Sequence, residues 1–376
     1  MGGDRSEEDT LMCTISLCMI VKNEEDVLAR CLDSVQGLAD EIILVDTGST
    51  DATRDIARRY TDKVFDFVWV DDFAAARNVS FEHATMEYCL WLDADDVIED
   101  ADRERFLHLK RTLSPGTDIV MLPYHTAFDS EGRPTFTYYR ERLIRNHPSF
   151  RWAGAIHEVI EPAGRIVYGE AAVSHRKLRP GDPDRNLRIF EKLRQTGHIL
   201  SPRETFYYAR ELYYHERYRE AAAEFNRFLD AGQGWVENNI DACRLLSACY
   251  AALGQDNDAL HALLRSFFYD APRAEACCDL GAYFLNRGQV STAIFWYELA
   301  LTRHADPKSG AFVSPDCSGY IPCLQLCVCY DRLGDRDKAI AYNDRAEAFK
   351  PGDPSCAYNR AYFQAQDGPD PDREKA

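Results

Sequence analysis

Three carboxylates stand within four residues in the segment Trp91-Leu-Asp93-Ala-Asp95-Asp96. Charges of one sign at this spacing repel each other unless a cation lies among them. A hard divalent ion such as Mn²⁺ or Mg²⁺ takes oxygen ligands and also binds phosphate oxygens. The segment therefore predicts a metal site that serves a phosphorylated ligand. The alternative is an N-terminal cap for the helix expected after it.

Two other polar segments suit the same kind of ligand. Asp46-Thr-Gly-Ser-Thr-Asp51 follows an apolar run, and Asp46 can accept hydrogen bonds from a ribose or a base, or cap the next helix. Asp72-Phe-Ala-Ala-Ala-Arg77 sets a guanidinium one turn inside a helix of small residues. Because the alanines leave room, Arg77 can reach a base or a phosphate; a surface ion pair is the alternative.

The adjacent pair His157-Glu158 is a further chemical group, and His175 follows it. Apolar residues flank the pair, so one member can face a ligand while the other contacts a partner. From these residues alone, simple pairing of His157 and Glu158 with nearby arginines is the alternative.

Short β-rich runs alternate with amphipathic helical stretches over residues 14–122. The expected strands are Ile15–Val21, Glu41–Val45, Lys63–Val70, Tyr88–Leu92 and Asp118–Pro123. The expected helices are Glu24–Gln36, capped by Asn23, then Thr50–Tyr60, Phe73–Ala84 and Ala101–Leu113. This alternation predicts βαβ units and a mostly parallel sheet covered on both faces. Ligands of such sheets bind beyond the carboxyl ends of the strands, where the polar segments lie.

A small motif recurs in the second half of the chain, where the β pattern disappears. In each copy a turn is followed five residues later by alanine: Glu216 to Ala221, Gly254 to Ala259, Gly288 to Ala293 and Gly334 to Ala339. Successive copies start 38 (254−216), 34 (288−254) and 46 (334−288) residues apart. The pattern resembles tetratricopeptide repeats, and the longest step predicts an insertion at Asp306–Pro322.

Composition excludes several classes of function. The 376 residues carry a net charge of −18 without a basic run, which disfavours binding to nucleic acid or to anionic lipid. No apolar stretch approaches the length of a membrane span, and the N-terminus is polar and acidic, so we expect a cytoplasmic protein without a transmembrane segment. The 13 cysteines are expected to be reduced and buried as small apolar side chains.

Four segments together, Ile20-Val-Lys-Asn-Glu24, Asp46–Asp51, Ala76-Arg-Asn78 and Asp93-Ala-Asp95, resemble the nucleotide-binding half of family 2 glycosyltransferases. The resemblance implies an α/β GT-A domain, a nucleotide-diphospho-sugar fold of Rossmann type. It also implies a UDP-sugar donor and Mn²⁺ or Mg²⁺ as cofactor. Many relatives have Asp-Asp where this chain has Asp46-Thr47, which leaves one carboxylate for the base and ribose.

The resemblance assigns roles to particular residues. The donor would be held by Val21, Lys22, Glu24, Asp46, Arg77, Asp93 and Ala94. Asp95 would bind the metal, with His175 as a further ligand. In an inverting transfer a base deprotonates the acceptor, and the family suggests Glu158 for that base with His157 beside it.

The acceptor and the sugar are less constrained. A family 2 domain fused to such repeats looks like the sublancin-type peptide S-glycosyltransferases, which implies transfer of a hexose, here taken as glucose, to a peptide cysteine or hydroxyl bound by the repeats. A surface saccharide or a lipid-linked sugar is the alternative acceptor. A third hypothesis is a non-catalytic repeat scaffold with a sugar-nucleotide sensor. The aromatic run at 267–269 is compatible with a homodimer.

These patterns define the expected domains. Residues 1–12 and 367–376 are expected to be disordered, 13–178 to form the transferase domain, 179–200 a linker helix and 201–366 the helical repeats.

Overall fold

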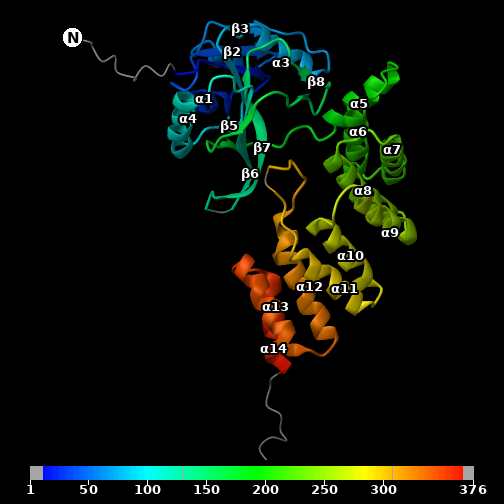
Figure 1. Cartoon of the computed structure of the whole chain (residues 1–376). Coiled ribbons are helices and arrows are strands. Elements are labelled where there is room, and N and C mark those ends of the chain that lie inside the picture. The colour runs from blue at the N-terminus through cyan, green and yellow to red at the C-terminus, as the bar shows by residue number, and fades with distance from the viewer. Residues whose placement is uncertain (1–11, 130, 307, 367–376) are drawn as a thin grey trace, which may run out of the picture. The chain divides into compact units, whose positions relative to one another are not determined.

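In the described residues, 12–129, 131–306 and 308–366, the N-terminal unit is built on a nine-stranded sheet and ends at Ile199 (Figure 1). The strand order is β3-β2-β1-β4-β7-β6-β11-β5, with β10 also paired to β6. The strands are β1 (Ile15–Val21), β2 (Glu41–Asp46), β3 (Val64–Asp66), β4 (Tyr88–Trp91), β5 (Asp96–Val97), β6 (Ile119–Phe128), β7 (Pro134–Arg145), β10 (Ile166–Tyr168) and β11 (Val173–His175). A separate ribbon pairs β8 (Trp152–Ala153) with β9 (Val159–Ile160).

The prediction of a mostly parallel sheet is confirmed, although the sheet is mixed. The pairs β1–β2, β2–β3, β1–β4, β6–β10 and β6–β11 are parallel, whereas β7 runs antiparallel to β4 and β6, and β5 runs antiparallel to β11. The reason is local: a short connection joins β6 directly to β7, and a connection without a crossover helix permits only an antiparallel pair.

Both faces of the sheet are covered, as predicted. Alternate residues of β1 enter opposite apolar clusters, with Leu17 and Met19 in one cluster and Cys18 in the other. The helices of this unit are α1 (Leu28–Ser34), α2 (Thr53–Ala57), α3 (Phe73–Glu82), α4 (Asp100–Thr112) and α5 (Arg185–Gln195). All thirteen cysteines of the chain are buried and free, which confirms their predicted packing role.

The predicted start of the first helix at Asn23 is wrong. Asn23 adopts a left-handed backbone with φ of 55°, and α1 begins only at Leu28. The Asn23 side chain accepts a hydrogen bond from the Thr50 backbone N–H at 2.8 Å, and the Ser49 hydroxyl accepts one from the Asn23 N–H at 3.0 Å. The loop after β1 is therefore tied to the loop after β2 and remains outside the helix.

The C-terminal unit consists of stacked helix pairs. The pairs are α6 (Pro202–Tyr214) with α7 (Tyr218–Ala231), α8 (Val236–Ala252) with α9 (Asp256–Arg265), α10 (Ala274–Asn286) with α11 (Val290–Ala300), and α12 (Tyr320–Arg332) with α13 (Arg336–Phe349); α14 (Pro354–Gln366) follows. Short 3₁₀ turns, η1 (Ser266–Phe268) and η2 (Pro315–Ser318), precede α10 and α12. Among the described helices none is long and apolar enough for a membrane crossing.

The repeated motif has a physical basis in the turns between paired helices. Glu216, Gly254, Gly288 and Gly334 occupy the same turn position, and all have positive φ between 58° and 76°. The alanines five residues later, Ala221, Ala259, Ala293 and Ala339, are at most 3% exposed. The left-handed residue reverses the chain, and the small alanine allows the second helix to approach the first.

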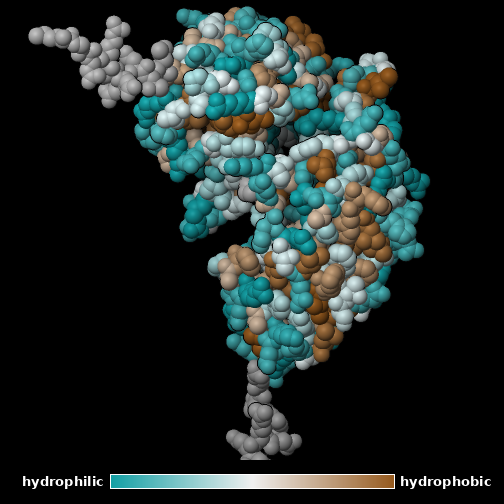
Figure 2. All heavy atoms as spheres, viewed as in Figure 1, coloured by the Kyte–Doolittle hydropathy of each residue, from teal (hydrophilic) through white to brown (hydrophobic). Residues whose placement is uncertain are grey.

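Hydrophobic residues also reach the surface of this unit (Figure 2). Phe268 is 89% exposed and Phe295 is 58% exposed, whereas their neighbours Phe267 and Trp296 stack on each other. Self-association through this surface stays a prediction.

Gly281 gives a test of the close packing in the third pair. A β-carbon at Gly281 would lie 2.6 Å from the Tyr297 ring, which is only 1% exposed and has no space to move. We expect Gly281→Ala to destabilise the chain by about 1–3 kcal/mol, as overpacking of a core does. Urea unfolding measures the loss. Tyr297→Leu in the Gly281→Ala background should recover part of it, and an exposed control on the same helix, Ala282→Ser, should change little. An unchanged midpoint for Gly281→Ala would contradict the close approach.

Candidate active site

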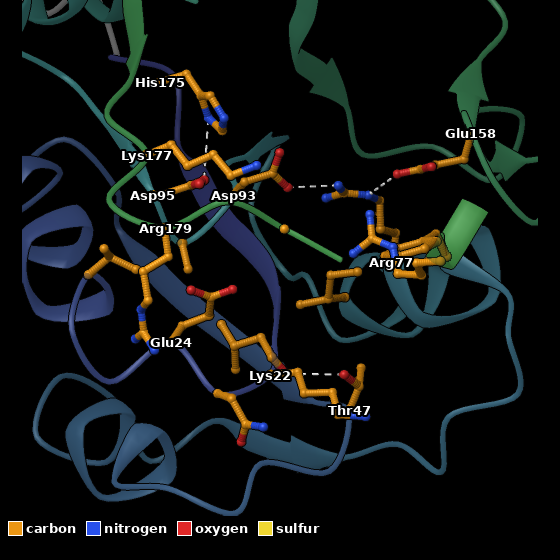
Figure 3. Close-up of a pocket in the computed structure, with 18 of the residues that line it drawn as sticks. Lys22, Glu24, Thr47, Arg77, Asp93, Asp95, Glu158, His175, Lys177 and Arg179 are labelled. Atoms are coloured by element: carbon orange, nitrogen blue, oxygen red, sulfur yellow. Dashed lines mark hydrogen bonds and ion pairs between the residues drawn. The ribbon is translucent and has the colours of Figure 1, made fainter. Parts of the chain in front are cut away.

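A pocket of about 710 Å³ lies at the carboxyl ends of β1, β2 and β4 (Figure 3). These strands are parallel, so the loops that follow them meet at one edge of the sheet. The pocket brings together ten of the eleven residues predicted for the site: Val21, Lys22, Glu24, Arg77, Asp93, Ala94, Asp95, His157, Glu158 and His175.

The loop after β4 is fixed by a fully buried ion pair. Arg142 of β7 donates to the Asp96 carboxylate at 3.0 Å and to the Trp91 carbonyl at 3.1 Å, and both Arg142 and Asp96 are 0% exposed. The Tyr124 hydroxyl donates to Asp96 at 2.9 Å, and the Asp93 backbone N–H donates at 3.0 Å. With its charge satisfied inside the protein, Asp96 holds the loop so that its neighbours face the pocket.

Asp95 and His175 are the candidate metal ligands of the pocket. The His175 Nδ1 lies 3.3 Å from an Asp95 oxygen and 3.2 Å from an Asp96 oxygen. A hydrogen bond with Asp96 raises the pKa of His175, and burial together with the charges of Asp93 and Asp96 raises the pKa of Asp95. Ligand atoms of Asp95, Asp96 and His175 lie within 4.8 Å of one another. Oxygen donors with one imidazole fit Mn²⁺ or Mg²⁺, so these residues suit the predicted ion.

Arg77 connects two carboxylates of the pocket (Figure 3). Its Nε donates to Glu158 at 2.6 Å, and its Nη2 donates to Asp93 at 2.8 Å. The guanidinium lies 4.9 and 5.0 Å from the ring centres of Trp91 and Trp152, and Arg77 is 7% exposed. Burial alone would favour the neutral form of Asp93, but the charges of Arg77 and Arg142 and the hydrogen bond from Arg77 together outweigh it and lower the pKa of Asp93 to about 2. Arg77 thus holds the side chains of Asp93 and Glu158 in place from one guanidinium.

The segment that carries His157 and Glu158 is attached to α3. Asn78 donates to the Trp152 carbonyl at 3.0 Å and accepts from the Trp152 N–H at 2.9 Å. The Ala155 carbonyl accepts a hydrogen bond from the first helical N–H of α3 at 2.8 Å. His157 has a φ of 52°, so the backbone turns sharply just before Glu158. The short helix α3 therefore positions Arg77 and Glu158 together.

The structure does not bring Asp46 into the pocket. Asp46 is 1% exposed, and its carboxylate accepts hydrogen bonds from the Gly48 and Ser49 backbone N–H groups at 3.1–3.3 Å. It shapes the turn after β2, and the capping alternative is wrong as well, because α2 begins at Thr53 after Ala52 and has no side-chain cap. The neighbouring Thr47 lines the pocket instead, with its hydroxyl 3.2 Å from the Val21 carbonyl.

Glu24, in the loop after β1, also lines the pocket, and the charges of Asp95 and Asp93 act on it. Burial, followed by the charge of Asp95, raises the pKa of Glu24 to about 7. Arg179, which ion-pairs with Asp26, opposes this shift.

Four cations of the pocket were missed in the sequence: Arg140 on β7, Lys177 and Arg179 just after β11, and Arg185 at the start of α5. The signal for Lys177 and Arg179 was the basic run that follows His175, whereas Arg185 lies in the stretch interpreted as a linker helix. Within the part of the chain that the structure describes, Lys22 and Lys177 have no carboxylate partner within 4.0 Å, unlike Arg77 and Arg140. Both lysines remain available to an anionic ligand.

The sequence of the N-terminal unit matches a known family. The family model for glycosyl transferase family 2 matches residues 16–162. This stretch is a family 2 glycosyltransferase domain. The predicted α/β transferase fold followed by tetratricopeptide-like helices is thereby confirmed.

Relatives of the transferase domain include proteins with additional parts. A TPR repeat-containing protein of Synechococcus elongatus is 37% identical over 151 residues, which are 40% of this chain and 36% of that protein. The SPβ prophage-derived glycosyltransferase SunS of Bacillus subtilis is 27% identical over 274 residues, which are 68% of this chain and 62% of SunS. The chain therefore spans about a third of the first relative and less than two thirds of the second.

Two solved structures are each similar to about half of the chain. The TPR protein YrrB is 20% identical, with a TM-score of 0.36 over 48% of this chain and 84% of its own. Glucosyl-3-phosphoglycerate synthase from Mycobacterium tuberculosis, solved with Mg²⁺ and UDP, is 18% identical, with a TM-score of 0.35 over 50% of this chain and 81% of its own.

Neutralising Asp95 and neutralising its neighbour Asp96 should change the free energy of unfolding differently. The pKa of Asp95 is raised, so its charged form is disfavoured in the folded state at pH 7.5, and Asp95→Asn should leave stability unchanged or higher. Asp96→Asn leaves the buried Arg142 without its counter-charge and should cost about 3–5 kcal/mol. Urea unfolding in the presence of a chelator measures both. Equal losses in the two variants would contradict this division of roles.

Proposed function

We propose that this chain is a metal-dependent inverting glycosyltransferase that moves a hexose, glucose being the first candidate, from a UDP-sugar to an acceptor on a peptide. The observation that carries the proposal is the Arg77 bridge between Asp93 and Glu158 at the wall of a pocket that also holds Asp95 and His175. In this proposal Asp93 serves the donor, Asp95 and His175 the metal ion, and Glu158 the acceptor. All of these except His175 lie within residues 16–162, which the family model matches.

The roles that we propose for donor binding follow from the charges of the pocket residues. Asp93, kept ionised by Arg77, is suited to accept hydrogen bonds from ribose hydroxyls. Asp95 and His175 would hold the divalent ion, which when bound supplies electrostatic stabilisation of the departing diphosphate. Lys22 and Lys177 line the same pocket and would bind diphosphate oxygens.

For the acceptor, we propose Glu158 as the group that takes the proton. Its side chain is 12% exposed and lines the pocket, where it can take a proton from an attacking thiol or hydroxyl. The hydrogen bond from Arg77 Nε occupies one carboxylate oxygen of Glu158 at 2.6 Å, which leaves the other oxygen for a proton of the acceptor. A thiol, with an ordinary pKa of about 8.5, needs much less help from a base than a hydroxyl does. A peptide cysteine is therefore our first candidate acceptor, ahead of a peptide hydroxyl or a saccharide.

Donor binding is tested by thermal shift with UDP-sugars and Mn²⁺. UDP-glucose with Mn²⁺ should raise the melting temperature, since a ligand at a hundredfold excess over its Kd adds about 2.7 kcal/mol to the folded state. Asp95→Ala should lose the increment that depends on Mn²⁺, whereas the exposed control Asp62→Ala should retain it. A shift that persists in Asp95→Ala would separate donor binding from this metal site. Binding without turnover on any test peptide would instead favour the sensor hypothesis.

Glu158→Gln separates catalysis from binding. Glutamine keeps an oxygen for the Arg77 hydrogen bond but cannot accept the acceptor proton, so UDP release with a cysteine-bearing test peptide should fall about 10²–10⁴-fold. The thermal shift by the donor should stay close to that of the unaltered chain. Glu161→Gln, an exposed change three residues away, is the matched control. Equal rates in both variants would exclude Glu158 as the base.

A further inference from the structure

The connection between α11 and α12 is longer than the repeat pattern requires. The motif step that contains it is 46 residues, against 34 residues for the preceding step. The insertion is the yellow-orange segment between these helices in Figure 1. Residues 311–314 form no helix or strand, yet they are half-buried, so this part of the insertion lies against the helical unit. We call residues 308–314 the inserted segment.

The inserted segment contacts the first helices of three successive pairs. Phe312 packs on Phe206 of α6, with ring centres 6.0 Å apart. The Ser314 backbone N–H donates to Glu275 of α10 at 2.6 Å. Before them in the chain Gly310, with φ of 72°, approaches Trp235 at the start of α8 so closely that a β-carbon would lie 2.9 Å from the ring. Five residues of the segment thus contact α8, α6 and α10 in turn.

The site around Phe312 has the composition of a recognition pocket. Arg210 lies over the Phe312 ring at 4.8 Å and also stacks near Phe206, Tyr207 and Tyr214. Its Nη2 donates to the Tyr214 hydroxyl at 2.9 Å, but its buried Nε has no hydrogen-bond partner among the described residues. A cation surrounded by aromatic rings attracts a further aromatic side chain through its face. Phe312 supplies that ring in this structure.

A second group on the same helices also lacks a partner. Asn238 of α8 is 2% exposed, and its Oδ1 accepts no hydrogen bond from any described residue. Asn238 and Asp241 are three residues apart, so they share one side of α8, and the charge of Arg210 on α6 acts on Asp241. A buried amide oxygen without a donor is unfavourable. A backbone N–H of an extended peptide would satisfy it.

We propose that the face formed by α6, α8 and α10 is a binding surface for an extended peptide with an aromatic side chain, and that the inserted segment occupies it as a tethered competitor. Phe312 fills the place of the partner's aromatic residue between Phe206 and Arg210. A free peptide must displace the segment, so its apparent affinity is reduced by the fraction of molecules in which the face is covered. This inference involves only the helical unit and does not rest on sugar transfer.

The test uses the full chain and a fluorescent peptide with the sequence of residues 308–316, KSGAFVSPD, together with the same peptide carrying alanine for phenylalanine. Fluorescence anisotropy measures binding. Phe312→Ala should bind the first peptide at least tenfold more tightly than the unaltered chain does, because the competitor has lost its anchor. The alanine peptide should bind neither protein. Phe268→Ala, which removes an exposed phenylalanine elsewhere in the unit, should behave like the unaltered chain.

Two further variants keep the proposal falsifiable. Gly310→Val should displace the segment from Trp235 while leaving α6 intact, and should give the same gain in affinity even if Phe312→Ala fails to fold. Adding Arg210→Gln to either variant should abolish the gain. If Gly310→Val and Phe312→Ala are both folded by thermal melting and neither binds the peptide more tightly, the segment is a fixed part of the fold and the proposal is wrong. No sugar nucleotide enters the assay, so failure here leaves the proposed transferase activity untouched.

Discussion

The buried pair of Arg142 and Asp96 is the interaction on which the arrangement of the pocket depends. Three carboxylates in four residues cannot share one loop unless positive charge is built in beside them. Arg142 forms an ion pair with Asp96, and Arg77 forms one with Asp93. Asp95 has only His175 beside it, at 3.3 Å, and no arginine partner among the described residues, and its pKa is raised. An ion pair with no exposed surface thereby determines which aspartate can serve a ligand.

Much of the fold and many of the pocket residues could be predicted from the sequence, because strand periodicity and polar residues at strand ends are local signals. The β1 bounds were predicted to the residue, and Asp93, Asp95, Glu158 and His175 do meet in one pocket. The repeat motif was readable for the same reason: a turn residue with positive φ and a small alanine recur at fixed spacing.

Sequence reasoning missed contacts between distant segments and also one local contact. Nothing near Arg77 indicates that Trp91 and Trp152 will enclose it or that it will bridge Asp93 and Glu158. Asp46 has the expected place in the sequence, but backbone N–H groups two and three residues away occupy its carboxylate. Lys177 lies at the end of the predicted transferase domain, where no pattern indicated that β11 carries it to the pocket.

The charges that remain suggest how the pocket would meet a diphosphate. Arg77 and Arg140 are already paired with carboxylates of the protein, so they have little charge to offer a ligand. A diphosphate entering alone would find Lys22 and Lys177, but also Asp95 and the nearby Glu24. A divalent ion on Asp95 and His175 would reverse the sign of that side of the pocket. It would also lower the pKa of Glu24, because a cation favours the ionised carboxylate. Under the proposed function, the same carboxylates that would repel a free diphosphate would favour one that arrives with a metal ion.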